Sequence, residues 1–286
     1  MKTLDYELRK LCERNRDGSY SWQGDRRQTL KLICKQLREL GFLHMSAASL
    51  KRKHVEALVE RWLGEGLDPG TIKNRVSHLR WWAQKVGRSS EIPKGNAALG
   101  IPNRQYAPNE NKARQLGAEP GIADVYVLMS AELQQELGLR REECIKFQPS
   151  FADQRHCIQI KQSWAKGGRA RNIPITTQAQ RDVLNRAHAL AGKGSLIPPN
   201  LSYIQQRHVY DRQCKVAGLR RMHGLRHAYA QARYEALTGW KAPAAGGPTV
   251  RMLTPQQRIV DRQARQIISR ELGHERISIT ARYLGR

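Results

Sequence analysis

The sequence has little cysteine, little acid and no long hydrophobic run, and each shortage excludes a class of protein. The five cysteines are odd in number, and no two of them form a C-x-x-C pair. This pattern argues against both a disulfide framework and a zinc ribbon, and it favours a reducing cytoplasm. The cysteines are Cys12, Cys34, Cys144, Cys157 and Cys214.

The sequence also lacks the marks of membrane insertion and of secretion. No apolar run approaches the roughly 18 residues that a spanning helix requires. The N-terminal stretch MKTLDYELRKLCERN carries charge throughout, whereas a secretory signal has an uninterrupted apolar centre. We therefore expect a cytoplasmic, nucleoid-associated protein with no membrane partner.

Acidic residues are scarce relative to basic ones. The 286 residues contain 25 Asp and Glu against 50 Lys and Arg, which leaves a net charge of +25. The excess is not confined to a tail, because residues 1–100 carry +9 and residues 101–286 carry +16. An excess of positive charge this large, spread along the whole chain, favours a polyanionic partner that contacts both halves. Double-stranded DNA is the first candidate.

The first 90 residues show helical periodicity. Apolar residues recur every three to four positions in 29–41, in 49–66 after a Ser49 cap, and in 71–87 after Pro69. The basic residues of the third stretch lie largely off its apolar stripe, so they form either a solvated face or a DNA-binding face. These candidate DNA-binding residues are Lys73, Arg75, Arg80 and Lys85.

A segment rich in Gly, Pro, Ser and Asn separates two domains. It predicts a helical domain at 1–90, a linker at 91–112 and a larger domain at 113–286. In the larger domain a helix is expected at 123–138 and two short strands at 157–160 and 171–175. Everything from 176 onward looks helical, apart from a loop at 241–249. The predicted fold class is mainly α with a small antiparallel β-sheet.

Four clusters carry side chains that are capable of chemistry: GLRREE (138–143), KGGRARNIPI (166–175), HGLRH (223–227) and LGHERISITARY (272–283). Each alone favours an ordinary interpretation: a solvated cation, a turn residue, a surface pair or a core tyrosine. Together they supply two guanidiniums, a lysine, two histidines and a tyrosine. This set suits phosphoryl transfer at a DNA phosphodiester, with the tyrosine as nucleophile.

At these four clusters the sequence resembles the tyrosine recombinases of the phage-integrase family. GLRREE is similar to the family's first arginine box, which implies a catalytic Arg140 supported by Glu143. KGGRARNIPI is similar to the family's β-hairpin motif, since Arg171 and Pro174 follow at the family's spacing. The resemblance implies that Lys166 protonates the 5′-hydroxyl leaving group.

The remaining two clusters complete the resemblance. HGLRH is similar to the family's His-x-x-Arg-His box and implies catalytic His223 and Arg226, with His227 as a packing partner. The LGH segment contributes His274, and the family tyrosine follows that histidine by nine residues. This spacing identifies Tyr283 as the expected nucleophile.

The resemblance also implies an architecture and partners. It implies a SAM-like, core-binding N-domain and a catalytic domain that clamp duplex DNA between them. A tetramer would exchange strands at attachment sites of a mobile element through 3′-phosphotyrosine links and a Holliday junction, with an accessory excision factor. No metal, nucleotide or other cofactor is expected, because the phosphotyrosine conserves the energy of the broken bond.

Two departures from the family pattern stand out. Arg226 and His274 lie 48 residues apart, which makes 235–262 look like an insertion. It is either a tolerated surface loop or a contact with DNA or another subunit. Only three residues follow Tyr283, so we expect no C-terminal segment that docks on a neighbouring subunit, as many members of the family have.

Other functions remain as alternatives. A type IB topoisomerase shares the chemistry, but the SAM-like N-domain argues against it. A non-catalytic or degenerate DNA-binding protein would not need all six catalytic positions filled. A metal- or nucleotide-dependent enzyme finds no supporting motif.

Overall fold

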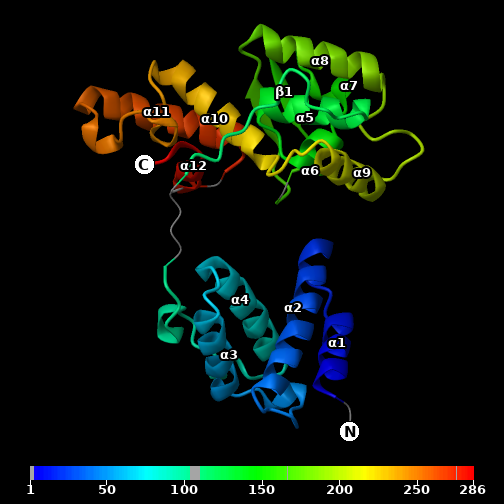
Figure 1. Ribbon diagram of the computed structural model, residues 1–286, viewed down its shortest axis with the longest axis vertical. Helices are drawn as coiled ribbons and strands as arrows, with labels where there is room; N and C mark the ends of the chain where they lie inside the picture. Colours follow the sequence, from blue (N-terminus) through cyan, green and yellow to red (C-terminus); the bar gives the residue numbers. More distant parts are fainter. Residues whose placement is uncertain (1–2, 104–109, 166, 275) are drawn as a thin grey trace. The chain divides into compact units, whose positions relative to one another are not determined.

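The computed structural model describes residues 3–103, 110–165, 167–274 and 276–286, and it separates into two compact units. Unit 1 is Met1–Gln105 and unit 2 is Tyr106–Arg286 (Figure 1). The boundary falls within the predicted linker, 91–112. None of the described helices is both long and apolar enough to cross a membrane.

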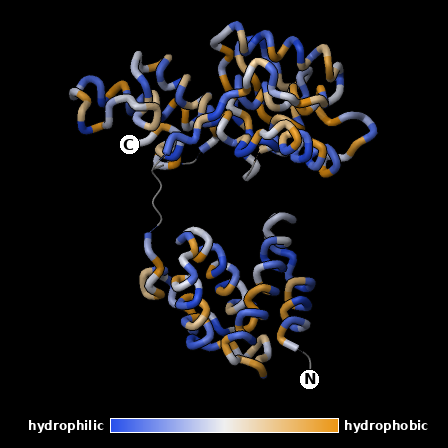
Figure 2. Tube along the Cα trace, viewed as in Figure 1, coloured by the Kyte–Doolittle hydropathy of each residue, from blue (hydrophilic) through white to orange (hydrophobic). Residues whose placement is uncertain are grey.

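Unit 1 is built from helices that bury an apolar stripe. The helices are α1 (Leu4–Arg14), α2 (Tyr20–Glu39), α3 (Arg52–Gly64) and α4 (Pro69–Lys85), with short 3-10 turns at Ala47–Ser49, Ser89–Glu91 and Ala97–Leu99. Trp62 and Trp82 are fully buried at its centre. Figure 2 shows hydrophobic and hydrophilic residues alternating along these helices, as amphipathic packing requires.

The start of α3 corrects one sequence prediction. The periodicity predicts a helix that begins after a cap at Ser49, but Ser49 ends a 3-10 turn and α3 begins at Arg52. The backbone of Leu50 is not helical (φ −58°, ψ 127°), and its side chain is fully buried in the core, so the helix starts only after this residue. Ile92, Leu99 and Ile101, which fall within the predicted linker, also pack in this core.

Unit 2 contains the remaining elements. The helices are α5 (Val125–Leu137), α6 (Arg141–Ile145), α7 (Pro149–Ala152), α8 (Gln178–Ala191), α9 (Tyr203–Val216), α10 (His223–Thr238), α11 (Pro255–Glu271) and α12 (Ile277–Leu284). The strands β1 (Cys157–Ile160) and β2 (Arg171–Pro174) pair antiparallel, with Ile158 opposite Ile173. This confirms the predicted fold class of mainly α with a small antiparallel sheet.

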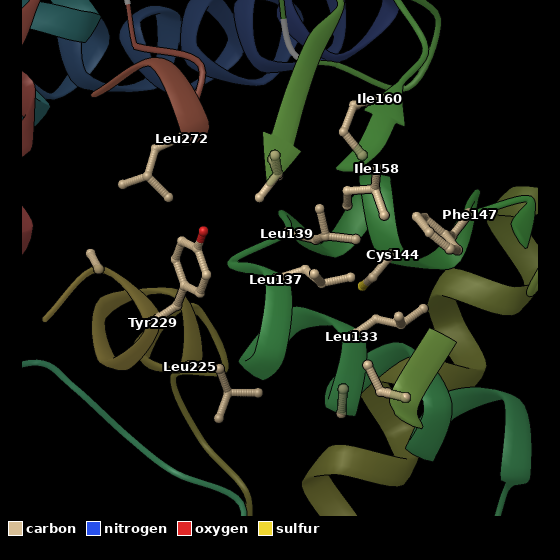
Figure 3. Close-up of a cluster of buried hydrophobic side chains, with 14 of the residues drawn as sticks. Leu133, Leu137, Leu139, Cys144, Phe147, Ile158, Ile160, Leu225, Tyr229 and Leu272 are labelled. Atoms are coloured by element: carbon tan, nitrogen blue, oxygen red, sulfur yellow. The ribbon is translucent and has the colours of Figure 1, made fainter. Parts of the chain in front are cut away.

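The core of unit 2 forms around α5 and α10. Figure 3 shows Tyr229 projecting from α10 between Leu272 on one side and Leu137 and Leu139 on the other. Its hydroxyl donates to the buried Glu271, at 2.9 Å. The core therefore joins α5, α10 and α11, and the clusters at 138–143, 223–227 and 272–283 begin at ends of these helices.

The region after β2 is less uniformly helical than the sequence suggested. Irregular segments separate α8 from α9, α9 from α10 and α11 from α12, because Gly192, Gly218 and Gly273 lie just after helix ends with positive φ. The expected insertion, 235–262, contains the end of α10, the 3-10 turns Pro243–Ala245 and Val250–Met252, and the start of α11.

Candidate active site

The site begins at a glycine between α5 and α6. Gly138 ends α5 with a φ of +61°, and a Cβ there would lie 2.3 Å from Cδ1 of Tyr229. Only glycine combines this conformation with so close an approach. The tight turn places Leu139 in the core and Arg140 at the N-cap of α6.

Glu143 is the buried centre of an arginine cluster. Its carboxylate accepts from Nη1 of Arg140 at 2.8 Å and from the backbone N–H of the same residue at 2.7 Å. Arg171 on β2 donates to both carboxylate oxygens, at 2.8 and 2.7 Å. Burial alone would raise the pKa of Glu143, but the hydrogen bonds and charge of Arg171, with Arg226 and Arg140, lower it to about 2.

These bonds connect the glutamate to the turn after α11. Arg140 Nη2 donates to the Leu272 carbonyl at 3.1 Å, and Nε of Arg171 donates to the Glu271 carbonyl at 2.7 Å. The sequence matched Arg171 only to a motif position and gave it no role. In the structure it is a bidentate partner of Glu143 that fastens β2 to α11.

Arg226 is fully buried near the first turn of α10. Its two terminal nitrogens donate to the carbonyls of Gly138 and Leu272, and its Nε lies 3.5 Å from the Tyr283 hydroxyl. Burial lowers the pKa of this guanidinium to about 10, so it remains charged at neutral pH. The carbonyls hold the Arg226 fork in place and direct Nε toward the tyrosine.

Tyr283 lies on α12 with only 7% of its surface exposed. A hydrogen bond of 3.0 Å joins its hydroxyl to Nε2 of His223. The ring centroids of His227 and His274 lie 4.4 and 5.2 Å from that of the tyrosine. The structure therefore brings together five of the six predicted catalytic residues, and the ring of His227 packs against that of the tyrosine.

The three histidines around Tyr283 are held in their neutral form. Burial of the rings and the neighbouring positive charges lower the pKa of His223 and His227 to about 4 and that of His274 to about 3. Arg226 contributes to all three shifts. His223 is exposed as a whole residue, but its Nε2 faces the tyrosine, so a neutral proton acceptor lies beside a phenol.

Family models match both units of the chain. A model described as phage integrase, N-terminal, matches residues 1–92, and a model described as integrase matches residues 105–232. Together the two models cover more than half of the chain, which belongs to the phage-integrase family. The match to the integrase model ends before His274 and Tyr283, so it does not test these two residues. A comparison with curated proteins finds no match.

Solved structures of DNA-bound integrases and of a site-specific recombinase share the fold of this chain. A lambda integrase tetramer bound to a Holliday junction is 16% identical, with a TM-score of 0.56 over 96% of this chain and 78% of that one. The Tn1549 transposon integrase with circular intermediate DNA is 13% identical (TM-score 0.56, 100% and 96% covered). XerH recombinase bound to a palindromic difH substrate is 15% identical (TM-score 0.59, 99% and 81% covered).

The sixth expected catalytic residue, Lys166, lies outside the residues that the structure describes. Its neighbours on either side belong to the turn between β1 and β2. No group of three or more His, Cys, Asp or Glu side chains within the described ranges could hold a metal ion.

The four basic residues expected on the DNA-binding face belong to α4. Arg80 donates to the Pro93 carbonyl at 2.8 Å, and Arg75 lies over the Trp62 ring, 5.2 Å from its centroid. Lys85 lies 3.9 Å from Asp17, whereas Lys73 is half-buried. Their contact with DNA stays a prediction, and at Arg80 and Arg75 it would have to coexist with these packing contacts.

Sequence reasoning missed two polar residues that support the tyrosine helix. Gln231 donates from Nε2 to the Tyr283 carbonyl at 3.0 Å. His223, His227 and Gln231 follow one another at intervals of four, so they share one face of α10. That spacing was a signal that could have identified Gln231. The second residue, Arg265 on α11, lies outside the four clusters, and its position gave no comparable signal.

Proposed function

We propose that this protein is a site-specific DNA recombinase in which Tyr283 is the nucleophile. The observation that carries the proposal is the position of the Tyr283 hydroxyl, 3.0 Å from His223 Nε2 and 3.5 Å from Arg226 Nε. A phenol between a neutral imidazole and a fixed guanidinium can lose its proton to the first and attack a phosphate bound by the second.

In the proposed step the Tyr283 oxygen attacks a DNA phosphorus atom. The phenol proton passes to Nε2 of His223, the new P–O bond forms a 3′-phosphotyrosine, and the bond to the 5′ oxygen breaks. Lys166, by the family resemblance, gives its proton to that departing oxygen. Arg226 and Arg140 neutralise the charge that develops on the non-bridging oxygens. Attack by a 5′-hydroxyl reverses the step and rejoins the strand.

The proposed substrate is a double-stranded attachment site of a mobile element, cut during integration or excision. The net charge of +25 supports a long duplex partner. The similar lambda integrase occurs as a tetramer on a Holliday junction, and we propose the same assembly for this chain, with an accessory factor for excision. Binding should weaken steeply with salt, since phosphate contacts release counterions.

Covalent trapping tests the proposal. The wild-type protein would first select duplexes from a random-sequence library, and the selected site would then be nicked near its centre so that the released fragment diffuses away. A denaturing gel should show a protein–DNA adduct for the wild type and none for Tyr283→Phe. Digestion of the adduct should leave the phosphate on Tyr283. A DNA that is bound tightly but never trapped would favour a non-catalytic binding protein.

A further inference from the structure

The helix that carries Tyr283 has little stability of its own. α12 has eight residues, and isolated helices of that length are marginal in water. Its last carbonyls lack partners inside the helix and need donors from elsewhere. The direction of the Tyr283 side chain therefore depends on what holds the C-terminal end of α12.

The loop after α10 packs against that end. Gly285 caps α12 with a φ of +77°, and a Cβ on it would lie 2.8 Å from the backbone N of Ala244 and 3.1 Å from Cβ of Pro243. Ala242 is fully buried in the core of unit 2. The first part of the expected insertion is thus a packed segment and not a free surface loop.

A sharp turn fixes the shape of this segment. A Cβ on Gly247 would lie 1.7 Å from the Lys241 carbonyl oxygen, a distance that no side chain tolerates. The backbone N–H of Gly247 donates to the Ala242 carbonyl at 3.0 Å, and Gly246 has a φ of +86°. The glycines close the segment on itself, so its 3-10 turn, Pro243–Ala245, presents a rigid surface to α12.

A chain of hydrogen bonds from α11 holds the same C-terminal end of α12. Nη1 of Arg265 donates to the Gly285 carbonyl at 2.9 Å, and its Nε donates to Asp261 at 2.8 Å. Asp261 also accepts from the Tyr234 hydroxyl at 2.6 Å, which in turn accepts from Nε1 of Trp240 at 3.2 Å. Arg265 and Asp261 are both buried, so these bonds are shielded from water.

We propose that residues 239–247, Asp261 and Arg265 form an intramolecular clamp that holds α12 on its own catalytic unit, which makes Arg265 a positioning residue for Tyr283. This inference rests on the proposed function, because holding α12 in place matters for the reaction only if Tyr283 is the nucleophile. Arg265 fixes the carbonyl two residues after the tyrosine, and Gln231 fixes the carbonyl of the tyrosine itself. Two anchored carbonyls set the rotation of α12 about its axis.

Arg265→Met is the principal test variant, and Arg233→Met is its matched control. Arg233 on α10 makes a half-buried ion pair with Glu271 on α11, at 3.0 Å, but among the described residues it makes no hydrogen bond to α12. Both variants lose a cation that is paired with a carboxylate of α11. Only the first loses a donor to the nucleophile helix.

The rate of covalent adduct formation would be measured at saturating protein on the same nicked duplex. We expect Arg265→Met to lower it by about 10- to 100-fold, because small misplacements of a reacting group cost this much, while DNA affinity stays unchanged. Arg233→Met should react at the wild-type rate. A 5′-bridging phosphorothiolate, which needs no proton on its leaving group, should show the same loss, since the defect lies in the nucleophile.

Hydrogen exchange without DNA provides a second readout. The amides of 277–285 should exchange faster in Arg265→Met than in the wild type or in Arg233→Met. If Arg265→Met fails to fold, the same measurements would be made on Gln231→Leu. This variant removes the hydrogen bond to the Tyr283 carbonyl and leaves no buried charge unpaired. Unchanged exchange and unchanged rate would overturn the clamp, as would equal losses in the control. A wild type that forms no adduct would instead overturn the proposed function, and hydrogen exchange would still test the clamp.

Discussion

Nε2 of His223 lies 3.0 Å from the Tyr283 hydroxyl oxygen, and Arg226 Nε lies 3.5 Å from the same atom. The tyrosine therefore has a proton acceptor and a cation in contact with one oxygen. Because these three residues come from the start of α10 and from α12, the packing of α12 on α10 creates the site.

The first prediction concerns the pH dependence of cleavage. Partial burial and the charges of Arg226 and Arg140 lower the pKa of His223 to about 4, so its ring can accept a proton at any higher pH. The single-turnover rate should be flat from about pH 8 to pH 5 and should fall as the pH drops through 4. His223→Gln should lower the rate by about 10²- to 10⁴-fold.

His208→Gln is the control for this prediction, since His208 is an exposed histidine on the neighbouring helix α9. It should cleave at the wild-type rate. Circular dichroism at each pH would confirm that the protein remains folded. A wild-type rate that falls with a midpoint near 6.5, the ordinary histidine value, would show that the surroundings of His223 do not act as described.

The second prediction concerns Arg226→Lys. An ammonium cannot replace a guanidinium that donates to the carbonyls of Gly138 and Leu272 and also faces Tyr283. Adduct formation should fall by about 10²- to 10³-fold, and urea should unfold the variant at a lower concentration. Arg233→Lys should change neither quantity by a comparable amount. A variant with wild-type cleavage would show that Arg226 is only structural.

The third prediction concerns which subunit supplies the tyrosine. Tyr283 contacts His223 and Arg226 of its own chain, so each subunit should cleave the DNA to which it is bound. A mixture of Tyr283→Phe and Arg226→Lys proteins should therefore form no more adduct than either protein alone. Recovery of activity in the mixture would show that α12 is exchanged between subunits.

The fourth prediction concerns stability at acid pH. His227 is buried with a pKa lowered to about 4, whereas an unfolded histidine titrates near 6.5. The unfolded chain therefore binds this proton first, and the free energy of unfolding should fall as the pH drops from 6.5 to 4. The loss from this residue is on the order of 1–3 kcal/mol. Urea titrations at pH 7 and pH 5 should show a smaller difference for His227→Gln.

The sequence indicated the expected catalytic residues better than it indicated the residues that hold them in place. The four clusters, taken together with the family resemblance, were enough to group the expected catalytic residues. The described members of that group are Arg140, His223, Arg226, His274 and Tyr283. Nothing local could reveal that Arg171 would pair with a glutamate 28 residues earlier. Such pairs depend on tertiary packing, which local periodicity does not encode.

The expected insertion shows the same limit. Its Pro, Gly and Ala composition suggested an exposed loop, yet Ala242 is buried and the glycines close a turn against α12. Small residues permit close backbone packing as readily as flexibility, and composition does not distinguish the two. Arg265, a charged residue on a polar helix, likewise gave no sign that it would bond to the Gly285 carbonyl.

Asn111, near the start of unit 2, is bonded to the same residue that holds the backbone of Tyr283. Its side chain exchanges hydrogen bonds with Gln231, at 2.8 and 3.3 Å, and the same Gln231 nitrogen holds the Tyr283 carbonyl. Three residues further on, the Arg114 N–H donates to the Gly224 carbonyl in the first turn of α10. A displacement of residues 111–114 would therefore reach α10 directly and, through the single amide of Gln231, the backbone of Tyr283.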